Sequence, residues 1–173
     1  MKIAIVVGHN SRRMGAYSPH LKGSEFPFNS EASELIEPGP HTVKTFFRDP
    51  SVRGYYSEIL DCYGRCDDWG AEATVELHFN SATPTAHGTE TLSSGSTGSM
   101  ELARVFQATM IEGLGLRDRG IKVRRSGRGS LSLLAGQAPA ILTEPFFGSN
   151  ADDCKGMTPA KLAKVYSAAI AKL

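Results

Sequence analysis

The segment Val75–Ser81 constrains the fold of this chain more than any other part of its sequence. Its residues alternate in polarity, Val75, Leu77 and Phe79 with Glu76, His78 and Asn80. This is the two-residue period of a β-strand with one apolar and one polar face. In open α/β sheets ligands bind just beyond the carboxyl ends of the strands, so His78 stands where a metal ligand is expected. A lone histidine there more often hydrogen-bonds a neighbour, and the rest of the chain must decide between the two.

Two other segments have the continuous apolar character of strands that are buried on both faces. Ile3–Val7 runs into His9 through a glycine, and Pro139–Thr143 runs into Glu144. Three expected strands therefore end in a polar residue able to do chemistry: His9, His78 and Glu144.

Strands alternate with helices along the remaining sequence. We expect further strands at 41–47 and 87–92, a long loop at 10–27, and helices at 29–37, 55–66, 99–113 and 159–173. This order predicts an α/β fold, a single three-layer domain with a mixed, mostly parallel twisted sheet and helices on both faces. At 173 residues the chain suits one domain, 1–173.

The charge balance argues against two classes of partner. Nineteen basic and eighteen acidic residues give a formal charge of +1, so no bulk field attracts nucleic acid or an anionic membrane. The one basic cluster, from Arg117 to Arg128, contains no aromatic residue for stacking on bases. We interpret it as a solvated loop or the rim of an anionic-ligand site.

The cysteines and the N-terminus predict a cytoplasmic origin. Cys62 and Cys66 lie one turn apart in an expected helix and Cys154 is far away, which favours reduced, buried thiols over a disulfide or a zinc site. The apolar run that follows Met1 is too short for a signal peptide, and no stretch is long enough to span a bilayer. We expect a monomer without stable membrane association.

The residue types at the strand ends suit a zinc hydrolase. A catalytic zinc ion takes three protein ligands from imidazole and carboxylate groups and keeps one position open for water. Two histidines and one glutamate satisfy that requirement. A separate carboxylate can then take a proton from the water and pass it to a leaving amine.

Five motifs in order resemble the zinc-dependent N-acetylmuramoyl-L-alanine amidases of the Amidase_3 type. They are Val7–Asn10, Glu25 with Asn29, Leu77–Asn80, Arg119–Lys122, and Pro139–Glu144 running into Phe147–Asn150. The resemblance covers nearly the whole chain. It implies a zinc ion on His9, Glu25 and His78 and a catalytic carboxylate at Glu144. The implied reaction is hydrolysis of the amide bond between N-acetylmuramic acid and L-alanine in peptidoglycan.

The chain departs from that family pattern at several positions. Glu76 replaces the usual serine two residues before the second histidine, and it is a rival to Glu25 as ligand or a partner of an imidazole. We favour Glu25, because a ligand from a separate loop surrounds a metal better than a strand neighbour does. Phe146 and Ala135 stand where the family has glycine and often arginine, so contacts of those loops with substrate are open.

The resemblance also suggests which residues meet the substrate and what the protein is for. We expect Asn80, His87 and Arg125 to contact a muramoyl-peptide. With no wall-binding domain in the sequence, the leading hypothesis is a bacteriolytic endolysin of a phage or prophage, made in the cytoplasm and acting on the cell wall. The alternatives are a cytoplasmic amidase that recycles muropeptides and a metal-free binding or regulatory module on the same fold.

Overall fold

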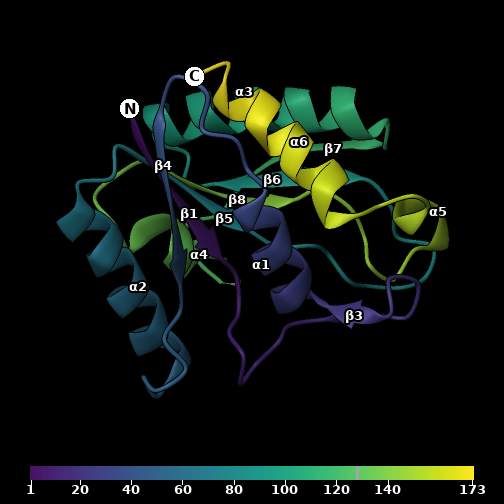
Figure 1. Ribbon diagram of the computed structural model, residues 1–173, viewed down its shortest axis with the longest axis horizontal. Helices are drawn as coiled ribbons and strands as arrows, with labels where there is room; N and C mark the ends of the chain where they lie inside the picture. The colour runs from purple at the N-terminus through teal and green to yellow at the C-terminus, as the bar shows by residue number, and fades with distance from the viewer. Residues whose placement is uncertain (128) are drawn as a thin grey trace.

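The computed structural model describes residues 1–127 and 129–173, and it contains a six-stranded sheet between two layers of helices (Figure 1). The strands of this sheet are β1 (Lys2–Val7), β4 (Thr42–Phe47), β5 (Ala73–Leu77), β6 (Thr89–Ser93), β7 (Asp118–Val123) and β8 (Ala140–Glu144). The helices are α1 (Glu25–Glu34), α2 (Tyr55–Trp69), α3 (Thr97–Leu114), α4 (Ser130–Leu134), α5 (Ala151–Cys154) and α6 (Pro159–Ile170). A small hairpin consists of β2 (Tyr17–Ser18) and β3 (Gly23–Ser24).

The sheet is mixed and mostly parallel, with the order β4-β1-β5-β8-β6-β7. Only the β6–β8 pair is antiparallel, and every other neighbouring pair is parallel. Val7 lies opposite Leu77, and Leu77 lies opposite Thr143. The strands β1, β5 and β8 therefore end level with one another, which brings the residues that follow them together at the carboxyl end of the sheet.

The two faces of the sheet are covered by different helices. Ile3 and Ile5 of β1 face a core with α1, α3 and α6, whereas Ala4 and Val6 face a second core with α2. The same alternation puts Val75 and Leu77 on the first face. Glu76 and His78 consequently lie on the α2 side. The α/β fold with helices on both faces is confirmed.

The structure corrects the expected start of the first helix. α1 begins at Glu25 instead of residue 29, and Pro27 falls in its first turn. A proline is tolerated there because the first N–H groups of a helix have no partner within it. Part of the expected loop 10–27 is thus helix and hairpin.

The sequence predicts a loop or a ligand-site rim at 117–128, but residues 118–123 form strand β7. β7 pairs with β6 at the sheet edge, and its residues are exposed or only partly buried. Gly120 has a φ of +77° and the β6–β7 register shifts near Thr89. An exposed edge strand with such an irregularity does not show the alternation of a half-buried strand. Arg128, also part of that expected loop, lies outside the described residues.

Both chain ends lie at the end of the sheet where the parallel strands begin (Figure 1). The carbonyl oxygen of Met1 accepts a hydrogen bond from the Thr42 N–H, and Gly39 lies beside Ala171. Within the described part of the chain, no helix combines the length and the apolar character that crossing a membrane requires. Cys62 and Cys66 of α2 have free thiols that are buried in the second core.

Candidate metal centre

His9 follows β1 in a backbone conformation that is unusual for a residue with a side chain. Its φ is +68°, in the left-handed region. A Cβ atom at Gly8 would lie 2.4 Å from the His78 ring, and one at Gly15 would lie 2.6 Å from Glu25 Oε2 and from the His9 ring. These two glycines therefore leave the space in which the two imidazoles and the carboxylate approach one another.

Glu25, the first residue of α1, is buried between both histidines. Its Oε1 lies 2.9 Å from His78 Nδ1, and its Oε2 lies 3.2 Å from His9 Nε2. Two backbone groups also donate hydrogen bonds to this carboxylate, the N–H of Ala16 at 2.8 Å and the N–H of Phe79 at 3.1 Å. The segments that follow β1 and β5 thus hold the Glu25 side chain from both sides.

The donor set of this cluster fits zinc. One ligand atom from each of His9, Glu25 and His78 lies within 4.8 Å of the other two. Burial would lower the pKa of His78, but the carboxylates of Glu25 and Glu76 outweigh it and raise this pKa to about 10. The cluster therefore attracts positive charge, and two imidazoles with one carboxylate are a ligand set that catalytic zinc uses.

Glu76 lies directly behind His78 and is fully buried. Its Oε1 is 3.1 Å from His78 Nε2 and forms an ion pair with Arg48, while its Oε2 accepts a hydrogen bond of 2.9 Å from the Tyr63 hydroxyl. Burial would raise the pKa of Glu76, but Arg48 and His78 keep it below its ordinary value. Both oxygens are thus engaged by Arg48, Tyr63 and the Nε2 side of His78, and Glu76 contacts His78 alone of the three clustered residues, which favours Glu25 over Glu76 as the ligand.

Glu144 ends β8 beside the cluster, and its Oε2 atom is buried without a hydrogen-bond partner among the described residues. Burial is the main reason that its pKa is raised to about 8, and the neighbouring carboxylates of Glu25 and Glu90 raise it further. Such a carboxyl group both accepts and releases protons near neutral pH.

A cavity of 830 Å³ opens over these residues, which we call the strand-end cavity. Its lining includes His9, Glu25, His78, Asn80 and Glu144. That size falls in the range of small-molecule and substrate sites. The strand ends thus meet in one hollow, as their positions in the sequence predicted.

The residues expected to meet the substrate have different positions. Asn80 lines the cavity, and its side-chain amide donates to Glu90 Oε1 at 3.0 Å. His87 and Arg125 are not among the residues that line it. Their role in substrate binding stays a prediction that their positions do not support.

Arg48, Tyr55 and Ser132 also line the cavity, and none of them was singled out as a site residue from the sequence. Arg48 follows β4, reaches Glu76 on β5, and packs with its guanidinium 5.7 Å from the Tyr55 ring centre. An arginine directly after the two phenylalanines that end β4 was the available signal. The sequence does not give its partner, because strand order decides which neighbour it meets.

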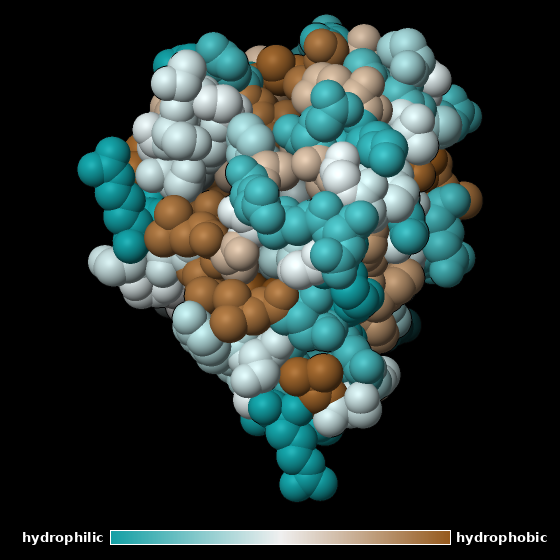
Figure 2. All heavy atoms as spheres, turned by 90° about the vertical axis from the view of Figure 1, so that its left-hand side faces the viewer, coloured by the Kyte–Doolittle hydropathy of each residue, from teal (hydrophilic) through white to brown (hydrophobic). Residues whose placement is uncertain are grey.

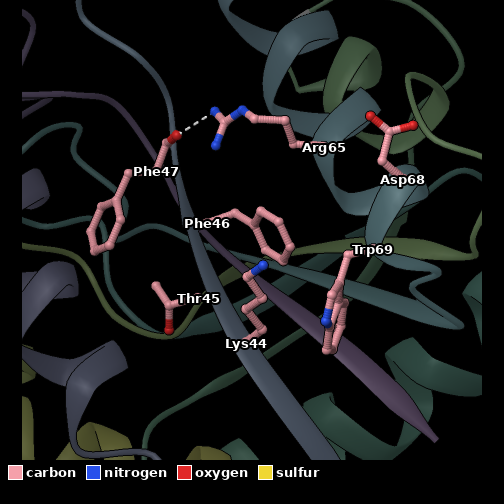
Figure 3. A pocket seen from close by; sticks show the side chains of 7 residues that line it. All are labelled: Lys44, Thr45, Phe46, Phe47, Arg65, Asp68 and Trp69. Carbon is pink, nitrogen blue, oxygen red and sulfur yellow. Dashed lines mark hydrogen bonds between the residues drawn. The ribbon is translucent and has the colours of Figure 1, made fainter.

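A second hollow, of 540 Å³, lies between β4 and α2 and is called here the β4–α2 hollow (Figure 3). It is lined by Lys44, Thr45, Phe46, Phe47, Arg65, Asp68 and Trp69. The Lys44 ammonium lies 5.0 Å from the Phe46 ring centre and 5.8 Å from that of Trp69. Arg65 donates to the Phe47 carbonyl at 2.7 Å. Figure 2 shows the molecule from the left-hand side of Figure 1, where apolar patches alternate with hydrophilic side chains.

Comparisons with known proteins find one matching family and several solved structures of similar fold. The family described as N-acetylmuramoyl-L-alanine amidase, Amidase_3, matches residues 3–173. An N-acetylmuramoyl-L-alanine amidase from Clostridium difficile 630 is similar in structure, with a TM-score of 0.83, 22% identity, and coverage of 99% of this chain and 95% of that one. The catalytic domain of an endolysin targeting Clostridia difficile has a TM-score of 0.81, 21% identity, and coverage of 99% and 97%. No curated protein matches the sequence.

Proposed function

Because this chain belongs to the N-acetylmuramoyl-L-alanine amidase family, we propose that it is a zinc-dependent hydrolase of the bond between N-acetylmuramic acid and L-alanine in peptidoglycan. The observation that carries the proposal is the convergence of His9, Glu25 and His78 within 4.8 Å of one another. Glu144 lines the same cavity. These are the four groups that a zinc amidase needs.

His9, Glu25 and His78 would hold the zinc ion. When bound, zinc supplies a Lewis acid that polarises the scissile carbonyl and lowers the pKa of a water molecule toward ~7. The chain's own contribution begins with Gly8 and Gly15, which keep room for the imidazoles. The hydrogen bonds from the Ala16 and Phe79 N–H groups orient Glu25.

Glu144 performs the proton transfers. Its carboxylate accepts a proton from the attacking water at the start of the reaction and donates one to the alanine nitrogen as the amide bond breaks. An oxygen without a hydrogen-bond partner among the described residues leaves this group free to bind the water and then the leaving amine. Burial raises the pKa of Glu144, which makes its carboxylate a better acceptor of the proton from water.

Analysis of peptidoglycan digests tests this function. The purified protein should release new alanine amino termini from peptidoglycan without new reducing sugar ends. Glu144→Gln keeps the shape of the side chain and should abolish the release while the protein retains zinc. New reducing ends would instead indicate cleavage of the glycan strand, and a wild-type protein without stoichiometric zinc would contradict the metal-dependent mechanism.

The biological role follows from the size of the preferred substrate. We propose an endolysin-like role in wall lysis, which is supported by the structural similarity to an endolysin catalytic domain. Rates on intact murein sacculi and on small soluble muropeptides should then favour the sacculi. A strong preference for soluble muropeptides would assign the protein to recycling instead.

A further inference from the structure

The proposed mechanism assigns no role to the buried carboxylate of Glu76. We propose that Glu76, held by Arg48 and Tyr63, is a positioning residue that fixes the ring of His78 and thereby sets the zinc affinity of the site. The inference rests on the proposed function, because it concerns the same three ligands.

The two nitrogens of His78 have separate partners. Nδ1 lies 2.9 Å from Glu25 Oε1, on the side of the ligand cluster, and Nε2 lies 3.1 Å from Glu76 Oε1, on the side of the core. Either carboxylate can accept a hydrogen bond from a protonated ring nitrogen. With zinc bound on the Glu25 side, Nε2 would be the nitrogen that keeps its hydrogen, and its N–H would donate to Glu76. In the neutral ring the lone pair is then on Nδ1 and points into the cluster.

Glu76 is itself held so that it cannot turn toward the metal site. The Arg48 guanidinium pairs with Oε1 and the Tyr63 hydroxyl donates to Oε2 at 2.9 Å. Arg48 and Glu76 are 3% and 0% exposed. A buried carboxylate is stable only when charge and hydrogen bonds compensate its loss of water, and these two partners do so.

The arrangement also limits the charge at the metal site. Arg48 neutralises Glu76, so Glu76 orients the imidazole without adding a net negative charge behind it. The guanidinium packs on the Tyr55 ring and reaches the Ser132 hydroxyl at 3.4 Å, which ties this pair to α2 and α4. Where the usual family pattern has serine, this chain thus has an anchored carboxylate.

Measurement of zinc affinity by competition with a chelator tests the inference. Glu76→Gln should weaken zinc binding by about 10–100-fold, the range found when a partner of a metal-bound histidine is removed. Glu90→Gln is the matched control, since Glu90 is also a buried strand glutamate paired with an arginine, Arg119, at 2.8 Å. It contacts no proposed zinc ligand, and its variant should bind zinc like the wild type.

Two further measurements separate positioning from general damage to the fold. The double variant Arg48→Met/Glu76→Gln leaves no unpaired buried charge, and it should fold yet still bind zinc about 10–100-fold more weakly. In the zinc-loaded wild type, nitrogen-15 NMR of the imidazoles should show His78 with its proton on Nε2 and the metal on Nδ1.

Wild-type affinity in the folded double variant, or a His78 ring with its proton on Nδ1, would overturn the inference and leave the proposed function intact. A wild-type protein that binds no zinc would overturn both.

Discussion

The strand-end cavity and the β4–α2 hollow differ in how their polar groups are arranged. In the strand-end cavity, buried carboxylates and imidazoles face one another, and Glu144 Oε2 has no hydrogen-bond partner among the described residues. In the β4–α2 hollow, the two cationic groups already have partners in the protein: Lys44 lies over two rings and Arg65 donates to the Phe47 carbonyl. A buried acceptor without a partner in the protein therefore marks a functional site better than aromatic or charged residues in a concave surface do.

The largest contrast between the hollows should appear when one carboxylate is neutralised in each. Glu25→Gln removes a proposed zinc ligand and should reduce zinc affinity by ~100-fold or more, since loss of a ligand's partner alone costs ~10–100-fold. Cleavage of peptidoglycan should fall with it. Asp68→Asn in the β4–α2 hollow should change neither metal content nor cleavage. Equal losses in both variants would remove the functional distinction between the hollows.

The stability of the zinc-free protein should depend on pH, because Glu144 in the strand-end cavity has a raised pKa. Burial raises the pKa of Glu144 from 4.5 to about 8, so the folded protein keeps a proton that the unfolded chain releases in this interval. The stabilisation is complete below 4.5 and is lost as the pH rises through about 8. His78, whose pKa is raised from 6.5 to about 10, adds a loss of the same sign at higher pH.

The midpoint of thermal unfolding should therefore fall between pH 4.5 and about 8, and it should fall less in Glu144→Gln. Parallel curves for the two proteins would show that Glu144 is not buried in its acid form.

Substitution of glycine by alanine should have opposite effects near the two hollows. Gly15 has a φ of +78° and a Cβ there meets Glu25 and His9, so Gly15→Ala should lower the free energy of unfolding by about 1–3 kcal/mol. Gly64 lies within α2, behind the β4–α2 hollow, and a Cβ there meets nothing within 4 Å. Gly64→Ala should raise the free energy of unfolding by about 0.5–1 kcal/mol. Denaturant unfolding measures both, and destabilisation by Gly64→Ala would be the unexpected result.

A small effect, confined to stability, is expected from the cation–π contacts of the β4–α2 hollow. Lys44→Met removes the ammonium from above Phe46 and Trp69 and should lower the free energy of unfolding by about 0.5–1 kcal/mol. Zinc affinity and cleavage should remain those of the wild type. A clear loss of cleavage of intact sacculi would mean that the β4–α2 hollow also contributes to substrate binding.

The central strands could be predicted from the sequence, and the edge strand β7 could not. β1 and β8 are buried on both faces and give continuous apolar runs, whereas β7 is exposed and irregular. The positions of His9, His78 and Glu144 followed from the same strands, because a strand end can be read from local pattern.

Two features of the site could not be predicted from the local sequence pattern. Glu25 was assigned as a ligand through the family resemblance, since its own segment looks like an ordinary polar loop. The contact of Arg48 with Glu76 depends on β4 and β5 lying on either side of β1. No local sequence pattern carries that information, because strand order is decided by the packing of the whole sheet.

The placement of Met1 and Ala171 beside the start of β4 has a practical consequence. The side chains of the strand-end cavity lie at the opposite end of the sheet, where the parallel strands finish. A fluorophore, an affinity tag or a surface linker attached beside Met1 or Ala171 therefore points away from the strand-end cavity. The protein can be immobilised by either end with its cavity facing the solution.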